Sequence, residues 1–245
     1  MQDKKLEEIH FDEFTAQNPW HAFTDNTYNK IIKLFLKLNP KKTDRIIDMG
    51  CGTGELAKKI FDLSFKNISG YDISGNCILM ASKAFPGINF EVKDIENTRL
   101  KANSVDLLFY CGILHHFTNT TKVIKEAKRI LKKDGRVFVF EPNAINPVLW
   151  LFRDEKSPFK SNKMKTPNER FMAKEQIKDA FDKGGFKCIK IDCVSGISYT
   201  KDYFKRIFPF PFFYIVYLYN LFDSLLNAAP FRRKFGSFIY GYFRK

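Results

Sequence analysis

A glycine-rich turn carries the clearest chemistry in the sequence. Asp48 precedes the stretch Gly50-Cys51-Gly52-Thr53-Gly54, and Glu55 follows it at the start of a helical pattern. Glycine lets the backbone approach a ligand closely, as it does in nucleotide-binding turns. The dinucleotide fingerprint has the spacing G-x-G-x-x-G and a helix N-terminus that is clear for a pyrophosphate. Here the spacing is G-x-G-x-G and carboxylates stand on both sides, which repels a diphosphate and suits the cationic end of an amino acid.

Further polar side chains lie at the ends of predicted strands. Asp72 ends the second strand, Asp94 follows the third, His115 and His116 follow the fourth, and Glu141 ends the fifth. Open parallel sheets bind their ligands at this edge, so we expect these side chains to meet there. A neutral imidazole titrates near working pH, so a histidine, with His116 slightly favoured, could remove a proton from an acceptor. The alternatives are a hydrogen-bonding strut for the histidines, and a loop-fixing bond instead of an acceptor contact for Glu141.

The elements that must position these residues form an alternation of strands and helices. Short apolar runs predict strands at 45–49, 67–71, 88–92, 105–110 and 136–140. Between them, spacing and end signals predict helices at 55–63, 74–85 and 119–132. The pattern is completed by a helix at 173–183 and by strands at 186–194 and 237–243. This alternation predicts a mainly parallel, doubly wound α/β sheet.

The chain of 245 residues fits one domain with additions, and no internal repeat divides it. We expect an N-terminal helical cap over 1–44 and a cofactor-binding core over 45–143. Two segments stand apart as insertions: 144–172, and the aromatic-rich 196–235 before the last strand.

A family resemblance rests on these residues taken in order. The stretch IIDMGCGTGEL resembles the first motif of the class I S-adenosylmethionine-dependent methyltransferases, of the type 11 kind. The similarity continues with Asp72, with Asp94 in VKDIE, and with LHHF after the fourth strand. It covers residues 45–143 and is weaker towards the C-terminus. It implies a Rossmann-like sheet of seven strands with an antiparallel last strand, S-adenosylmethionine as the cofactor, and methyl transfer as the reaction.

The resemblance also implies roles at the methionine end of the cofactor. The cofactor turn would be formed by Gly50, Cys51, Gly52 and Gly54. Asp48 would lie against the methionine amino group, and the stretch from Cys111 to Ile113 would line the methionine side.

At the nucleoside end, the resemblance implies that Asp72, with Ile73 beside it, would bind the ribose hydroxyls. Asp94 and the backbone of Ile95 would meet the adenine. The sequence departs from the family after Asp94, because it reads ENTRL where a Leu-Pro-Phe step is common. Asp72 alone would also suit the ribose of NAD, so the whole series, and not this residue, separates a methyltransferase from an oxidoreductase.

Other chemistries lack their usual signatures. Neither the Asn/Asp-Pro-Pro-aromatic motif of amino-group DNA methylation nor a Pro-Cys or Thr-Cys nucleophile occurs, so nucleic acid is not the favoured partner. The five cysteines have no zinc-ligand spacing and no Asp/Asn cluster suggests a catechol-type site, so we expect no metal. Isolated thiols and a charged N-terminal stretch favour a cytoplasmic protein. The alternatives are an RNA or protein methyltransferase, or a non-catalytic relative that binds the cofactor.

The C-terminal part is basic and aromatic. The net charge of +14 divides into +4 for residues 1–149 and +10 for residues 150–245. This asymmetry indicates an anionic partner, either nucleic acid or an acidic membrane surface, or a lysine-rich solvated surface. Charge alone does not choose between them. Sixteen of the 39 aromatic residues fall between Tyr203 and Phe243. The flanking cations are Lys201, Lys205, Arg206, Arg232, Arg233 and Lys234.

Prolines 209 and 211 and Asp223 argue against a membrane-spanning helix here. Aromatic residues flanked by cations instead suit the headgroup region of an anionic bilayer, so peripheral contact at the inner face of the membrane is one prediction. A packed lid and a dimer seam are the alternatives, and the oligomeric state stays open. Methyltransferases similar to this chain act on quinone precursors, lipids or sugars, so the resemblance implies a small lipid-like or lipid-linked acceptor, methylated at oxygen.

Overall fold

The structure is a computed structural model that describes residues 4–15, 22–153, 156–157, 166, 168–207, 211–228 and 231–245. The described residues form a seven-stranded sheet in the order β3-β2-β1-β4-β5-β7-β6. Its strands are β1 (Ile46–Met49), β2 (Ile68–Asp72), β3 (Asn89–Val92), β4 (Val105–Cys111), β5 (Leu131–Pro142), β6 (Lys187–Val194) and β7 (Phe238–Arg244). β7 runs antiparallel to both of its neighbours, and β1 to β5 pair in parallel, as the sequence predicted.

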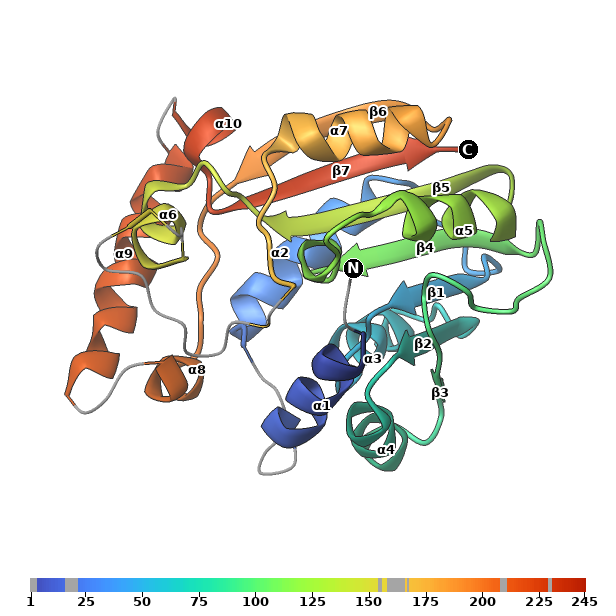
Figure 1. The fold of residues 1–245 in the computed structure, drawn as a ribbon, viewed down its shortest axis with the longest axis horizontal. Helices are drawn as coiled ribbons and strands as arrows, with labels where there is room; N and C mark the ends of the chain where they lie inside the picture. The colour runs from blue at the N-terminus through green and yellow to red at the C-terminus, as the bar shows by residue number, and fades with distance from the viewer. Residues whose placement is uncertain are drawn as a thin grey trace.

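Helices cover both faces of this sheet (Figure 1). They are α1 (Lys4–Thr15), α2 (Asp25–Leu36), α3 (Glu55–Asp62), α4 (Gly75–Ala84), α5 (Thr121–Ile130), α6 (Pro147–Arg153), α7 (Lys174–Lys183), α8 (Lys201–Ile207), α9 (Ile215–Ala228) and α10 (Arg232–Phe235). Two short 3-10 turns are η1 (Leu114–His116) and η2 (Phe212–Tyr214).

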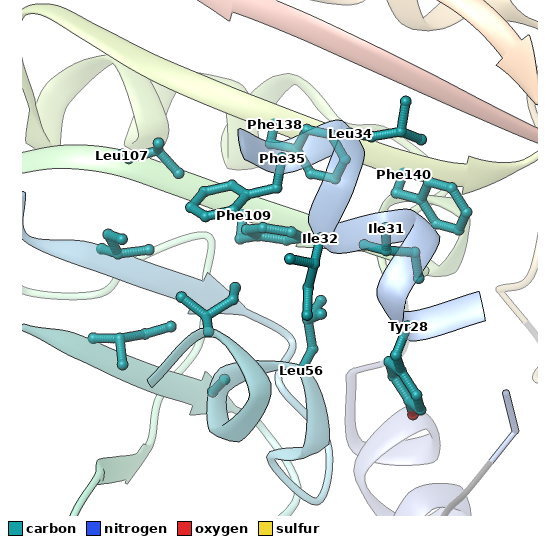
Figure 2. Packing of buried hydrophobic residues seen from close by; sticks show 14 of the residues in the cluster. Tyr28, Ile31, Ile32, Leu34, Phe35, Leu56, Leu107, Phe109, Phe138 and Phe140 are labelled. Atoms are coloured by element: carbon teal, nitrogen blue, oxygen red, sulfur yellow. The ribbon is translucent and has the colours of Figure 1, made fainter. Parts of the chain in front are cut away.

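Alternate residues of each central strand serve two separate cores. Ile46 packs with α2, α3 and α4 on one face, whereas its neighbour Ile47 packs with α5 and α7 on the other, because side chains alternate along a strand. On the first face, Phe35 of α2 meets Phe109 and Phe138 with ring centroids 5.2 and 6.3 Å away, and Figure 2 shows these three labelled side chains next to one another at the helix. This packing fixes the strand ends that carry the site.

One boundary differs from the prediction. The helix expected over 119–132 ends at Ile130, because Leu131 adopts an extended conformation, is fully buried and pairs with Val105. The predicted Asp134-Gly135 turn therefore lies inside β5 as an irregularity, where Asp134 has φ of 61°. In the described part of the chain, none of the helices combines the length and apolar character needed to cross a bilayer.

Candidate active site

A cavity of about 270 Å³ opens at the carboxyl ends of β1 to β4. This is the edge where the strand order reverses between β1 and β4, and open α/β sheets bind ligands at such a point. The predicted site residues on its wall are Asp48, Gly50, Cys51, Gly52, Asp72, Ile73, Asp94, Ile95, Cys111, His115 and His116. Gly54 and Glu141 are the predicted residues outside its lining.

The glycines of the turn have different tasks. Gly52 has φ of +52°, and a Cβ added there would meet nothing within 4 Å, so its face is open to the cavity. Gly54, with φ of +84°, is the N-cap residue just before α3, and a Cβ there would lie 2.6 Å from the ring of Phe90. Gly52 therefore leaves space for a ligand, whereas Gly54 allows the helix to pack on the sheet.

Two buried carboxylates follow β1 and β2. Asp72 accepts hydrogen bonds from the backbone N–H of Gly52 at 2.8 Å and of Ser74 at 3.0 Å, so it ties the glycine turn to the start of α4. Burial raises the pKa of Asp72 although these bonds oppose the shift. Asp48 is 2% exposed, and burial together with the charge of Asp72 raises its pKa to about 7. Such a pair favours a cation in the cavity.

Asp94 lies at the other end of the cavity. Its carboxylate accepts a hydrogen bond from Lys4 at 2.5 Å and another from the backbone N–H of Glu96 at 2.9 Å, and Lys4 also pairs with Glu96. The neighbouring Ile95 is 5% exposed and belongs to the core on the α5 face of the sheet. These contacts fix helix α1 to the loop after β3. They also hold the loop at the point where the sequence departs from the family pattern.

Glu141 holds the turn that carries the histidines. It is fully buried, and one oxygen accepts from the backbone N–H groups of Ile113 at 2.9 Å and Leu114 at 2.8 Å. The other oxygen lies 2.7 Å from Nδ1 of His115. Burial lowers the pKa of His115, but the hydrogen bond and charge of Glu141 outweigh it and the pKa is raised. A carboxylate in this position makes Nδ1 the donor, so the other ring nitrogen is the basic one.

His116 has a different environment. Its Nδ1 lies 3.0 Å from the hydroxyl of Thr166 and 3.4 Å from the carboxylate of Glu7, and the ring of Phe11 meets it edge to face at 5.2 Å. Burial and the neighbouring His115 lower its pKa, against the effect of Glu7. His115 is therefore the more basic of the two, although the sequence slightly favoured His116.

Several cavity residues were not predicted from the sequence. Lys4, Glu7 and Phe11 share one face of α1 at helical spacing, which is the signal that could have found them. A second group comes from the two insertions, where no motif marks its members. They are Leu149, Arg153, Thr166, Glu169, Phe171, Tyr199 and Tyr203. The insertions thus contribute part of the cavity wall.

The cavity wall also carries three possible metal ligands and two cysteine thiols. His115, His116 and Glu169 each offer one ligand atom within 4.8 Å of the others, a two-histidine, one-carboxylate set of the kind that can hold a divalent transition ion. Burial raises the pKa values of the Cys51 and Cys111 thiols well above the ordinary range. Since the thiolate is the nucleophile, these cysteines are not suited to covalent catalysis.

Comparison with known proteins agrees with this geometry. Residues 47–139 match the family model described as a methyltransferase domain. The ubiquinone/menaquinone biosynthesis C-methyltransferase UbiE of Campylobacter jejuni is 28% identical over 126 residues, which are 49% of this chain and 52% of that protein. A tRNA U34 carboxymethyltransferase of Campylobacter fetus is 28% identical over 181 residues, covering 69% of this chain and 59% of that protein. The chain thus spans about half to three fifths of the length of these relatives.

Among solved structures, phosphoethanolamine N-methyltransferase 2 of Haemonchus contortus in complex with S-adenosyl-L-methionine has a TM-score of 0.64 at 18% identity, over 98% of this chain and 57% of that one. The fold is that of a Rossmann-like methyltransferase. The matched domain over residues 47–139, the relatives and the fold together support a class I S-adenosylmethionine-dependent methyltransferase.

Proposed function

We propose that the protein transfers a methyl group from S-adenosylmethionine to an oxygen of a small, lipid-like or lipid-linked acceptor. The observation that carries the proposal is the mixed lining of one cavity. The open glycine turn and the buried carboxylates line it together with two histidines and the aromatic side chains Phe171, Tyr199 and Tyr203. Charged and polar groups combined with aromatic walls suit a polar cofactor and an amphiphilic acceptor.

The cofactor half of the proposal follows the wall of the cavity. Asp48 would hold the methionine ammonium, since it is a buried carboxylate with a raised pKa that gains from a cation. Asp72 would bind the ribose, because each carboxylate oxygen can accept a further bond beside those from Gly52 and Ser74. The remaining contacts would come from Gly50, Cys51, Gly52, Ile73, Asp94, Ile95 and Cys111.

The acceptor half depends on His115. S-adenosylmethionine supplies an electrophilic methyl group, which the acceptor takes by in-line displacement. We assign His115 as the base that receives the proton of the acceptor hydroxyl at Nε2, while Glu141 stabilises the resulting imidazolium from Nδ1. In this proposal Glu141 is a positioning residue. It fixes the turn through the N–H groups of Ile113 and Leu114, and it orients the proposed base His115.

Cofactor binding and methyl transfer are tested separately. Isothermal titration should detect S-adenosylhomocysteine binding and no comparable NADH binding. S-adenosylmethionine with a ¹³C-methyl group is then incubated with hydroquinones that carry alkyl tails and with a total lipid extract, and mass spectrometry searches for the labelled product. NADH binding without S-adenosylhomocysteine binding would refute the proposal.

The role of His115 is tested with Glu141→Gln. The glutamine can still accept from the N–H groups of Ile113 and Leu114, but its amide then faces Nδ1 of His115 and favours the tautomer with a proton on Nε2. We expect kcat to fall by about 10²-fold or more, while S-adenosylhomocysteine affinity changes by less than about threefold. An unchanged kcat would mean that His115 is not the base.

The methylated atom separates this proposal from a second one. A relative named as a C-methyltransferase favours carbon as the acceptor atom. Loss of a hydroxyl proton activates a phenol at either oxygen or carbon. The ¹³C chemical shift of the transferred methyl group distinguishes an ether from a carbon-bound methyl. His115 would have the same task in both reactions.

Nucleic acid is the competing class of acceptor, favoured by the basic charge and by the tRNA-modifying relative. Label transfer to tRNA, and not salt-sensitive binding alone, would support it. For the lipid-like acceptor, the proposal includes peripheral contact of a cytoplasmic protein with an anionic membrane, because such an acceptor resides there.

A further inference from the structure

Helix α9 and the turn before it expose a continuous apolar surface, which we call the α9 stripe. It consists of Tyr214, Tyr217, Leu218, Leu221, Phe222 and Leu225, whose side chains are 46 to 68% exposed. Their spacing of three and four residues places them along one side of the helix. Figure 1 shows α9 along the left margin of the molecule. Large apolar residues gathered in this way mark a contact surface.

The opposite side of α9 is anchored to the protein. Val216 is buried in a small core with Phe204 and Phe213. Asp223, the one charged residue of α9, is 2% exposed and accepts hydrogen bonds from the N–H of Ile197 at 2.6 Å and the hydroxyl of Ser237 at 3.0 Å. The stripe is therefore held outward by a fixed inner face, and its exposed side carries no charge.

Cations stand at both ends of the stripe. At the start, the ammonium group of Lys201 lies 4.5 Å from the centre of the Tyr214 ring. Beyond the other end, α10 begins with Arg232 and Arg233, and Arg232 donates a hydrogen bond to the carbonyl of Asn227 in α9. An apolar centre between two cationic ends matches a bilayer whose headgroups are anionic.

We propose that the α9 stripe is a docking surface for an anionic membrane, into which its aromatic and leucine side chains insert while Lys201 and the α10 cations contact the headgroups. A second copy of the chain fits less well. Whether two stripes paired parallel or antiparallel, cationic ends would lie beside cationic ends, and such contacts are repulsive.

The small core beneath the α9 stripe packs against residues of the cavity wall, which connects membrane docking with entry of the acceptor. This connection rests on the proposed function. Tyr199 and Tyr203 line the cavity, and they also pack against the small core beneath the stripe. The insertion that faces the membrane therefore forms the acceptor side of the cavity, so an acceptor with an apolar tail would enter from the docked face.

The apolar part of the proposal is tested with a matched pair of leucines. Leu218 in the stripe and Leu79 on α4 are both 68% exposed. Each is changed to Glu in the full chain, and sedimentation is measured with vesicles of phosphatidylcholine containing phosphatidylglycerol. Leu218→Glu should lower the partition coefficient about tenfold or more, and Leu79→Glu should change it by less than about twofold. Equal effects of the two variants would overturn the proposal.

The charge part uses Arg233→Gln, with Lys187→Gln on β6 as the control. Removal of Arg233 should weaken vesicle binding about fivefold, and binding should fall with salt and be much weaker to phosphatidylcholine alone. Failure of the unchanged protein to bind anionic vesicles at low salt would overturn the proposal. So would sedimentation equilibrium showing a dimer that Leu218→Glu dissociates. S-adenosylhomocysteine binding of the same samples is measured separately, so a failed proposal on methyl transfer cannot be mistaken for failed docking.

Discussion

Cofactor affinity should depend on pH through Asp48. Burial and the charge of Asp72 raise the pKa of Asp48 from 3.8 to about 7. If the methionine ammonium lies beside this carboxyl, the ionised form binds the cofactor and the protonated form does not. A group with a pKa of about 7 is roughly one-tenth ionised at pH 6 and nine-tenths at pH 8. S-adenosylhomocysteine should therefore bind about tenfold more tightly at pH 8 than at pH 6.

The stability of the cofactor-free protein should change in the opposite direction. Between pH values of about 4 and 7, the native Asp48 holds a proton that the unfolded chain has released, so the free energy of unfolding falls as pH rises through this window. The full loss is on the order of 4 kcal/mol. Asp48→Asn removes this loss, so it should raise the melting temperature at pH 8 while it weakens S-adenosylhomocysteine binding about 10- to 100-fold.

The assay is isothermal titration of S-adenosylhomocysteine at pH 6, 7 and 8, with thermal unfolding of the same samples. Asp48→Asn is the control, because the pH dependence that remains in it belongs to other groups, such as Asp72 and the histidines, and not to this carboxyl. Equal affinities of the unchanged protein at pH 6 and pH 8 would refute the reasoning. So would a variant whose pH dependence matches that of the unchanged protein.

Three further outcomes are expected. Gly54→Ala should destabilise the protein by about 2–4 kcal/mol, because φ is positive there and the added Cβ would clash with Phe90. Gly52→Ala should cost only about 1 kcal/mol of stability, yet it should weaken S-adenosylhomocysteine binding more than Gly54→Ala does. Melting curves and titrations of the two variants test this. Lys4→Met should weaken S-adenosylhomocysteine binding a few-fold with a stability change below about 1 kcal/mol, since its ion pair with Asp94 is partly exposed; an unchanged affinity would exclude a role for α1 in binding. Methyl transfer should survive removal of divalent ions by EDTA, because a His115 base needs none; activity lost and then restored by zinc or manganese would assign His115, His116 and Glu169 to a metal.

The sheet and the part of the cavity wall that we propose for the cofactor could be predicted because their signals are local. Short apolar runs marked the strands, and ligands of a parallel sheet bind at the strand ends, so Asp48, Asp72 and Asp94 could be placed together from their positions alone. The antiparallel last strand came from the family resemblance. The exact end of α5 could not be foreseen, because Leu131 is drawn into β5 by burial and by pairing with Val105, which are tertiary effects.

The acceptor side could not be predicted because its residues are brought together by packing over long sequence separations. Glu7 reaches His116 across more than one hundred residues. The backbone of Tyr199 at the cavity is held by the side-chain amide of Asn220 in α9, and the Asp223 carboxylate fixes the backbone nearby at Ile197. The same carboxylate seemed in the sequence to interrupt an apolar run. In the fold it is the buried anchor that turns the apolar side of α9 outward.

The position of Glu141 decides how the two histidines differ. From the sequence, either histidine could face the acceptor, and both line the cavity. Both histidines have a buried carboxylate near Nδ1, but Glu141 lies 2.7 Å from Nδ1 of His115, whereas Glu7 lies 3.4 Å from Nδ1 of His116. The carboxylate of Glu141 is itself fixed by two backbone N–H groups. Because Glu141 holds Nδ1, the ring of the proposed base His115 keeps one orientation. Its basic nitrogen, Nε2, therefore keeps one direction. This favours His115 over His116 on geometry, and the opposite shifts of their pKa values agree with it.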